Sequence, residues 1–331
     1  MAGPHSAHPG LSPPDVSIII IANRPTPFLS QALRAIQAIE HPVWEVVGVL
    51  NDAYAVDDAR VRFIASGRVG PAEKRDLGAR HARAPVLAFL DDDAYPSPGW
   101  LAAALPPFAD PHVAAVGGPG LTPPEDGFWQ QVSGWVYSSI IGSAGLRYRY
   151  VPGRGRDVDD FPSMNLLVRR SAFEAAGGFD SAFYPGEDTK LCLELTRRGG
   201  RIVYEPGALV YHHRRALWPG HARQVAAYGR HRGYFAKRYP ATSLRPHYFI
   251  PTAFVAWLVA GPFLGAWLGV WWGWLYVASL AAYGLALAVS GIDVAHRGRS
   301  AWLGLAVVPG LLLTHLVYGL TFVHGLLARR P

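Results

Sequence analysis

The chain has 331 residues and a formal net charge of +7; half of its residues are apolar and only 17% are charged. The apolar residues are unevenly placed, because residues 248–292 contain no Asp, Glu, Lys, Arg or His. This composition excludes an ordinary cytosolic enzyme. The part before residue 248 carries a net charge of only +4. Such mild basicity suits an anionic membrane surface better than a nucleic-acid groove, so no nucleic-acid partner is predicted.

The N-terminal part reads as a disordered tail followed by a βαβ unit. Residues 1–15 are rich in Pro, His, Gly and Ser and lack the apolar core of a signal peptide. Residues 16–22 form a continuous β-branched run, typical of a strand buried on both faces of a parallel sheet. A helical pattern that includes Leu29 and Leu33 follows, and residues 44–50 form a second buried strand. Strand, helix and strand predict a βαβ unit.

The same cycle then repeats and ends in three acidic residues. Residues 60–64 predict a weak strand, 72–82 a helix, and 86–90 a strand that runs directly into Asp91, Asp92 and Asp93. The predicted fold class is therefore α/β, with a Rossmann-like, mostly parallel central sheet whose function lies at the carboxyl ends of its strands. No GxGxxG follows the first strand and no GxxxxGK[ST] occurs, which argues against a Rossmann reductase and a P-loop ATPase.

The acidic triplet predicts a cation site. Residues two apart in an extended segment point the same way, so Asp91 and Asp93 can present two carboxylates to one point. Mg²⁺ or Mn²⁺ takes such oxygen ligands together with water and substrate phosphates, and a diphosphate would complete the site. The alternative interpretation is a solvated turn, and the position directly after a buried strand favours the cation site.

Two further groups of polar residues follow later in the chain. Glu187 and Asp188 open a helical segment, where they either serve catalysis or simply offset the helix dipole. His212 and His213 follow a strand-like run at 208–211, and neutral imidazole is a common metal ligand. The histidine pair is weak evidence by itself.

In combination, these segments resemble a known family, the inverting family-2 glycosyltransferases with the GT-A fold. The resemblance covers about residues 16–235 and lies in the segments VSIIIIANRP, WEVVGVLND, GPAEKRDLGARHARAPVLAFLDDDAYPSPGW, PSMNLLVRRSAFEAAGGFD and GEDTKLCLELTRRGGRIVYEPGALVYHH. It implies a GT-A domain over residues 16–217.

The resemblance also implies roles for the metal-type and catalytic residues. Asp91 and Asp93 match the family's DxD pair, with Asp93 on the metal that bridges the donor diphosphate and Asp91 near the ribose. His212 matches a histidine that completes the metal site in many members, with His213 close behind it. Asp188 matches the family's general base, and Glu187 is the alternative candidate for this role.

The same resemblance implies which residues contact the nucleotide. Arg75 matches an arginine expected near the nucleotide. The family usually has an acidic pair at the end of the second strand, where this chain has Asn51 and Asp52. Arg24 after the first strand and Arg230, within a pattern that closes over the donor in membrane-attached members, complete the expected nucleotide contacts.

The C-terminal part predicts a membrane region over residues 248–331. An uncharged stretch of 45 residues would make a helix of about 67 Å, more than twice the roughly 30 Å hydrocarbon core, so it must cross twice. We expect spans at about 249–268, 271–291 and 302–327, although the last one, with Pro309, either spans or re-enters. The preceding residues 218–247 predict an interfacial amphipathic segment on anionic headgroups.

Charge and acceptor chemistry then give the expected function. Basic residues lie before the first predicted span and after the second one. By the positive-inside rule, they predict a catalytic domain in the cytoplasm and spans in the inner membrane. The chain is expected to transfer a sugar from a UDP- or GDP-type donor, with Mg²⁺ or Mn²⁺, to a hydroxyl of a lipid-linked saccharide in polysaccharide biosynthesis. The alternatives are a polyisoprenyl-phosphate sugar synthase and a non-catalytic, membrane-anchored nucleotide-sugar-binding subunit.

Overall fold

The structure is a computed structural model that describes residues 13–41, 43–180 and 183–330. The chain divides into two compact units. The first consists of residues 1–120 and 154–211, and the second of residues 121–153 and 212–331. The expected tail at residues 1–12 lies outside the described residues.

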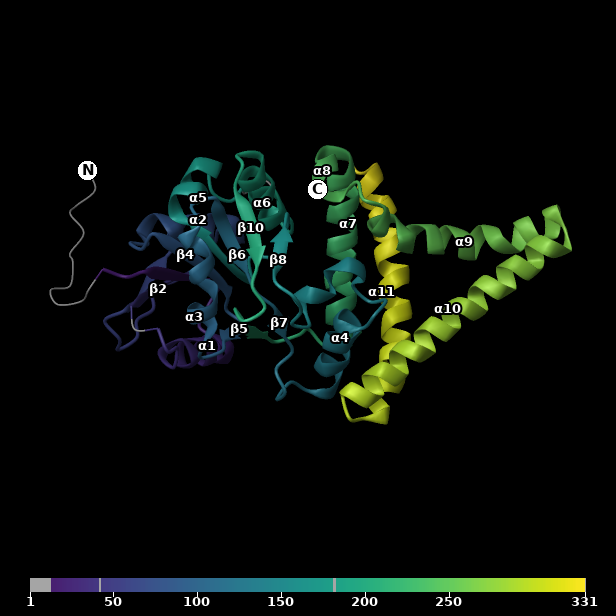
Figure 1. Cartoon of the computed structure of the whole chain (residues 1–331), viewed down its shortest axis with the longest axis horizontal. Coiled ribbons are helices and arrows are strands. Elements are labelled where there is room, and N and C mark those ends of the chain that lie inside the picture. Colours follow the sequence, from purple (N-terminus) through teal and green to yellow (C-terminus); the bar gives the residue numbers. More distant parts are fainter. Residues whose placement is uncertain (1–12, 42, 181–182, 331) are drawn as a thin grey trace. The chain divides into compact units, whose positions relative to one another are not determined.

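A large mixed sheet forms the centre of the first unit (Figure 1). Within the described residues it has eight strands in the order β3-β2-β1-β4-β9-β6-β10-β8. Their bounds are β1 (Val16–Ile21), β2 (Trp44–Leu50), β3 (Val61–Ala65), β4 (Val86–Asp91), β6 (Val113–Gly117), β8 (Arg156–Val158), β9 (Asn165–Arg169) and β10 (Arg201–Tyr204). The strands β1, β2, β3 and β4 are mutually parallel, whereas β9 runs antiparallel to its neighbours β4 and β6. The predicted mostly parallel sheet is thus confirmed.

The continuous apolar run of β1 is explained by helices on both of its faces. Ile18 and Ile20 belong to one apolar core with Leu29 and Leu33 of α1 (Pro27–Gln37). Ile19 points the other way and contacts α2 (Pro71–His81) at Gly78. Alternate side chains of a strand face opposite sides of the sheet, so a strand covered on both sides is buried at every position. Its polar residue, Ser17, is buried as well and donates a hydrogen bond to Glu45.

Smaller elements complete this unit. A three-stranded sheet has the order β5-β11-β7. Its strands are β5 (Ala94–Pro96), β11 (Val210–His212) and β7 (Gly120–Leu121). The remaining helices are α3 (Trp100–Ala104), η1 (Pro106–Ala109), α5 (Arg170–Ala176) and α6 (Glu187–Arg197). The carboxyl end of β4 and the first turn of α6 carry the acidic residues of the candidate site.

The second unit is helical. Its elements are α4 (Phe128–Ser138), η2 (Ala144–Arg149), η3 (Leu217–His221), α7 (Ala222–Arg238), α8 (Pro240–Ser243), α9 (Pro246–Leu268), α10 (Val270–Arg297) and α11 (Ala301–Leu327). The helices α9, α10 and α11 are long and apolar enough to cross a membrane. The helix α11 continues through Pro309 as one element of 27 residues, so this segment has the length of a full span.

The helix α7 packs tightly against α11 (Figure 1). A side chain at Gly229 or Gly233 would collide with α11 at Thr321 or Phe322. These glycines are four residues apart and therefore share one helix face, which allows close approach. The division into two units does not follow the predicted domain ranges, because residues 121–153 group with the C-terminal helices. The interfacial role predicted for residues 218–247 stays a prediction.

Candidate active site

The end of β4 presents the acidic triplet at the carboxyl edge of the sheet. The residues Val86 to Leu90 are buried, and the half-buried Asp91 is the last residue of the strand. Asp93 follows after a turn, directly before β5. Burial raises the pKa of Asp92 to about 7, and the negative charges of Asp93 and Asp91 add to this effect. Three adjacent carboxyl groups thus repel one another, which favours the binding of a cation.

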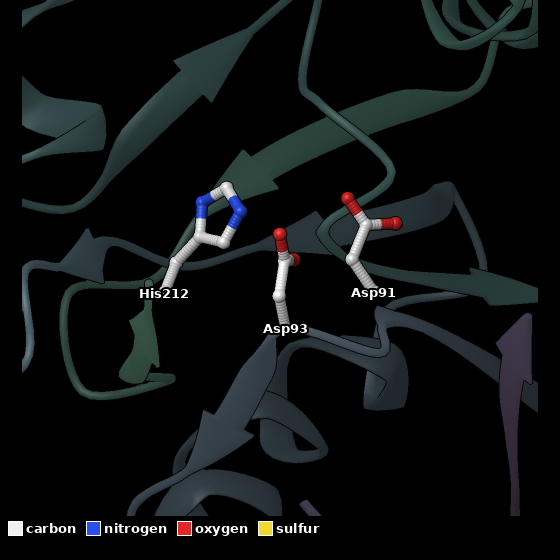
Figure 2. Close-up of side chains that lie close together, drawn as sticks. All are labelled: Asp91, Asp93 and His212. Carbon is white, nitrogen blue, oxygen red and sulfur yellow. The ribbon is translucent and has the colours of Figure 1, made fainter. Parts of the chain in front are cut away.

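Asp91, Asp93 and His212 come together in a metal-type cluster. One potential ligand atom from each of these half-buried residues lies within 4.8 Å of the others. In Figure 2 the Asp93 carboxylate lies between the imidazole of His212 and the carboxylate of Asp91. Two carboxylates and one imidazole fit a divalent cation such as Mg²⁺ or Mn²⁺, which would have positions left for water and phosphate oxygens.

The two histidines at the end of β11 have different partners. His212 Nδ1 lies 3.1 Å from Nη1 of Arg214, and a guanidinium can only donate. His213 Nδ1 lies 2.5 Å from Oδ1 of Asp126, whose Oδ2 accepts a hydrogen bond from the Arg214 amide. The structure therefore places His212 in the metal-type cluster and His213 in a buried pair with Asp126, a residue that the sequence reading had not singled out.

Arg75 is a buried link between the two groups of carboxylates. Its Nη2 donates to Asp91 Oδ1 across 2.9 Å, and its Nη1 donates to Glu187 Oε1 across 2.8 Å. The side chain is 7% exposed. Arg75 was expected near the nucleotide; in the structure it joins the end of β4 to the start of α6. One oxygen of Asp91 is thereby held by Arg75.

The first turn of α6 places two neighbouring carboxyl groups in different surroundings. The helix begins after Gly186, whose φ of +123° is a conformation that favours glycine. Glu187 is buried, and its pKa is raised to about 7 by burial and by the charge of Asp188, against the opposing effect of Arg75. Asp188 is only half-buried. Of the two, Asp188 is the more accessible to a substrate.

The turn at residues 177–180 (GGFD) supports the position of Arg75 through contacts that were not predicted from the sequence. The amide of Phe179 donates to Asp76 Oδ1 across 2.9 Å, and burial raises the pKa of Asp76 to about 6. The Phe179 ring lies against the guanidinium of Arg75, 5.4 Å from its centroid. The motif therefore helps to hold Arg75. The sequence feature that could have indicated these contacts is the triplet Lys74, Arg75 and Asp76, of which only Arg75 was predicted to have a role.

A second missed residue, Lys74, organises the ends of β1 and β2. Its ammonium donates to Ala22 O, Asn23 Oδ1 and Asn51 Oδ1 at 2.7, 2.9 and 2.7 Å. Asn51 is half-buried, whereas Asp52 and Arg24 are exposed at the same strand ends. The expected nucleotide contacts of the first unit thus lie along the edge that carries Asp91. Arg230 is an exposed residue of α7 in the second unit.

The mostly parallel sheet carries a DxD pair at its edge, near a histidine of the three-stranded sheet and the acidic start of α6, and this arrangement is that of a GT-A-type glycosyltransferase. Residues 13–231 match the family described as "Glycosyltransferase like family 2", and the chain belongs to this family. A curated relative, the pre-mycofactocin glycosyltransferase of Mycobacterium tuberculosis, is 33% identical over 191 residues, which are 57% of this chain and 40% of the relative. The O-antigen biosynthesis protein RfbC of Myxococcus xanthus is 26% identical over 233 residues, 63% of this chain and 18% of that protein. The chain thus spans less than half the length of these relatives.

Two solved structures share the fold. The mannosyltransferase PcManGT of Pyrobaculum calidifontis, in complex with GDP-Man and Mn²⁺, aligns with a TM-score of 0.52 and 19% identity, over 98% of this chain and 92% of that protein. GalNAc-T7 with UDP, GalNAc and Mn²⁺ aligns with a TM-score of 0.50 and 16% identity, over 72% of this chain and 52% of that protein. At this level of identity the likeness establishes the fold.

Proposed function

We propose that this glycosyltransferase is a metal-dependent, inverting enzyme that transfers a sugar from a nucleoside diphosphate sugar to a hydroxyl group. One observation carries the proposal: the buried guanidinium of Arg75 contacts both Asp91 in the metal-type cluster and Glu187 beside Asp188. A single side chain thus fixes the two groups of carboxylates that the reaction would need on opposite sides of the sugar.

The chemistry follows from these groups. Asp91, Asp93 and His212 would hold Mg²⁺ or Mn²⁺, which when bound neutralises negative charge on the leaving diphosphate. Asp188 accepts the proton of the acceptor hydroxyl while that oxygen bonds to the anomeric carbon and the bond to the diphosphate oxygen breaks. A single displacement inverts the anomeric configuration. Glu187 is less suited to this role, because it is buried and bound to Arg75.

The donor is proposed to be a UDP- or GDP-type sugar nucleotide. The structural neighbours that carry UDP or GDP-Man support this class. We assign Asn51, Asp52, Arg24 and Arg75 to the nucleotide end of the site, and Arg230 of α7 to a donor contact. His213, bonded to Asp126, is assigned to the support of its neighbour His212 in the metal-type cluster.

The acceptor is proposed to be a lipid-linked saccharide. Three helices with membrane-spanning length and apolarity would hold the enzyme at a bilayer, where a lipid-linked acceptor reaches a high effective concentration. Basic residues flank the proposed spans at Lys237, Arg238, Arg297 and Arg299. By the positive-inside rule they favour a catalytic domain in the cytoplasm and spans in the inner membrane, with the basic residues near anionic headgroups.

The test uses the full-length protein in nanodiscs with labelled donors. Three acceptors are offered: a lipid-linked saccharide, a water-soluble glycoside with the same terminal sugar, and a polyisoprenyl phosphate. Transfer to the lipid-linked saccharide, with an inverted linkage by NMR and loss of activity in EDTA, is the expected result. Preference for the polyisoprenyl phosphate would support a synthase instead. Donor binding without transfer to any acceptor would support a binding subunit.

A further inference from the structure

The helix α7 runs beside the C-terminal half of α11. Directly before α7, Nε2 of His221 lies 2.8 Å from Oγ1 of Thr314. At the other end of α7, Nζ of Lys237 donates to the backbone oxygen of Leu326 across 3.0 Å. The residue numbers increase together along both helices, so α7 and α11 run in the same direction. Their shared stretch is about 18 Å long, at 1.5 Å per residue.

The exposed side of α7 carries positive charges beside this stretch. Arg223 and Arg230 are exposed and seven positions apart, which places them on one side of the helix. Thr314 is the central residue of α11. If α11 crossed a bilayer, Arg223 would therefore lie near the bilayer centre. Charged side chains at that depth are costly, and those that occur face a bundle interior or a water-filled cavity. Exposed arginines on α7 thus argue against a crossing by α11.

The three apolar helices also differ in how far they are buried. Of the most apolar 18 residues in each helix, 33% are buried in α11, but only 6% in α9 and 11% in α10. Besides α7, α11 contacts α4, since Val307 and Leu311 share an apolar core with Val132 and Val136. In Figure 1 the hairpin of α9 and α10 projects away from α7 and α11. Only this hairpin presents nearly all of its surface to its surroundings.

The face of α11 that remains open is an apolar stripe. Its exposed residues recur at spacings of three and four, or multiples of them, and therefore lie on one side of the helix. They are Trp302, Leu305, Pro309, Leu312, Leu320, Val323 and Leu327. The polar residue His324 is exposed near the end of the stripe. An apolar stripe together with a basic neighbouring surface is typical of helices that lie in the plane of a membrane interface.

The charges at the helix ends favour the same arrangement. Basic residues lie before α9, between α10 and α11, and after α11: Arg245, Arg297, Arg299, Arg329 and Arg330. Two crossings place all of them on one side of the membrane, as the positive-inside rule requires, whereas a third crossing would separate the last two from the others. The turn between α9 and α10 carries exposed tryptophans, which are typical of the opposite interface.

We propose that α11 does not cross the membrane but lies in the plane of one interface, with its apolar stripe in the hydrocarbon of a single leaflet and α7 on the aqueous side. The chain then crosses only through the hairpin of α9 and α10. Of the three predicted spans, 249–268 and 271–291 remain crossings, and 302–327 becomes an interfacial helix. This topology goes beyond the proposed function and holds for any donor and acceptor.

The first experiment determines on which side of the membrane the chain ends. Full-length protein is expressed in bacterial spheroplasts with cysteine at one exposed position: Arg330, Trp271 or Arg34. A membrane-impermeant maleimide is added before or after lysis, and the unmodified protein, whose Cys192 is buried, is the blank. Arg330→Cys should react under the same condition as Arg34→Cys of the α/β unit, and Trp271→Cys under the other one. Reaction of Arg330→Cys from the side opposite to Arg34→Cys would show a third crossing and overturn the proposal.

The second experiment measures the depth of α11 in proteoliposomes. Nitroxide spin labels are attached to cysteines at Leu320 and Leu327 of α11 or at Leu285 and Ile292 of α10, one per variant. All four positions are exposed, and each pair spans seven residues, or about 10 Å along a helix. Relaxation by oxygen and by a water-soluble nickel complex gives the depth of each label.

The α10 pair is the matched control, because a crossing helix changes depth along its length. The two depths in α11 should differ by less than half of the difference found in α10, and both labels should be shielded from nickel. An equal difference in the two pairs would show that α11 crosses the bilayer. Full access of nickel to both α11 labels would show that the stripe lies in water. Either result overturns the proposal.

Discussion

Arg75 and Glu187, 112 residues apart in the chain, form a buried ion pair with 2.8 Å between Nη1 and Oε1. Both side chains are almost fully buried, with 7% and 5% exposure. The other terminal nitrogen of Arg75 bonds Asp91. The helices α2 and α6 and the end of β4 therefore depend on one guanidinium for charge balance.

Replacing Arg75 by Met should strongly destabilise the protein. The change leaves the Glu187 carboxyl buried without its cation, and breaking a buried pair in this way typically costs about 3–5 kcal/mol. Thermal unfolding in detergent, followed by circular dichroism, measures the loss. The double variant Arg75→Met with Glu187→Gln should recover part of the stability, because the buried carboxyl group of Glu187 no longer needs a cation. A single variant as stable as the unmodified protein would show that the pair does not stabilise the fold.

Asp188→Asn should separate donor binding from transfer. A general base typically contributes about 10²–10⁴-fold to the rate, so kcat should fall in this range while donor affinity stays unchanged. Glu187→Gln is the matched comparison one residue earlier. It removes the partner of Arg75, so thermal stability should fall more than in Asp188→Asn. Loss of donor affinity in Asp188→Asn would instead assign this carboxylate to the nucleotide site.

Asp93→Asn should abolish binding of Mn²⁺, whereas Asp92→Asn should largely preserve it. Asp93 belongs to the metal-type cluster with Asp91 and His212, and Asp92 does not. Both variants replace one carboxyl group of the triplet by an amide of the same shape, so the comparison isolates the ligand. Binding is followed by electron paramagnetic resonance of free Mn²⁺, and transfer is expected to stop in EDTA and to return with Mn²⁺ or Mg²⁺. Equal losses in the two variants would mean that charge alone, not geometry, attracts the cation.

The sheet and the acidic edge could be predicted because their signals are local. The buried run at 16–22 and the predicted strand at 86–90 correspond to β1 and β4, and the triplet follows β4 directly. The predicted strand at 60–64 and helix at 72–82 each differ from β3 and α2 by one residue at both ends. The periodicity of apolar residues and the end of a strand depend on residues that are adjacent in the chain, so both can be predicted from the sequence.

The supporting contacts depend on residues far apart in the chain. Lys74 bonds side chains 51 and 23 residues away, and His213 pairs with Asp126 across 87 residues. No spacing rule links such positions. The grouping of residues 121–153 with the C-terminal helices also depends on distant residues, such as Val136 of α4 and Leu311 of α11, which belong to one apolar core.

Arg214→Gln should tighten the binding of Mn²⁺ several-fold. In the structure Nη1 of Arg214 donates to His212 Nδ1, so the guanidinium competes with a bound cation for a lone pair of this ring. The amide oxygen of the introduced glutamine could accept from Nδ1–H, which leaves the lone pair on Nε2, and one positive charge is removed from the neighbourhood of the cation. Arg215→Gln, an exposed neighbour, removes the same charge without touching His212 and serves as the control. Weaker Mn²⁺ binding in Arg214→Gln would show that the guanidinium supports the site.

His221 should make the protein less stable in acid. It is fully buried, with Nδ1 2.8 Å from Ser133 Oγ and Nε2 2.8 Å from Thr314 Oγ1, and it links η3 to α4 and α11. Burial, with a smaller effect of the Arg214 charge, lowers the pKa of His221 to about 4 from its usual 6.5. The unfolded chain therefore binds a proton between these values that the folded protein excludes. The contribution of the neutral His221 ring to the stability of the folded protein is complete above pH 6.5 and is lost as the pH falls towards 4.

The size of this effect is at most about 3–4 kcal/mol, since one pKa unit corresponds to about 1.4 kcal/mol. Thermal unfolding in detergent between pH 4 and pH 7.5 measures it. His221→Gln removes the titrating ring but can still bond both hydroxyls, so its unfolding temperature should depend less on pH over this range. His112→Gln, a change at an exposed position, should leave the pH dependence as it is in the unmodified protein. Identical pH profiles for His221→Gln and the unmodified protein would show that other groups cause the acid sensitivity.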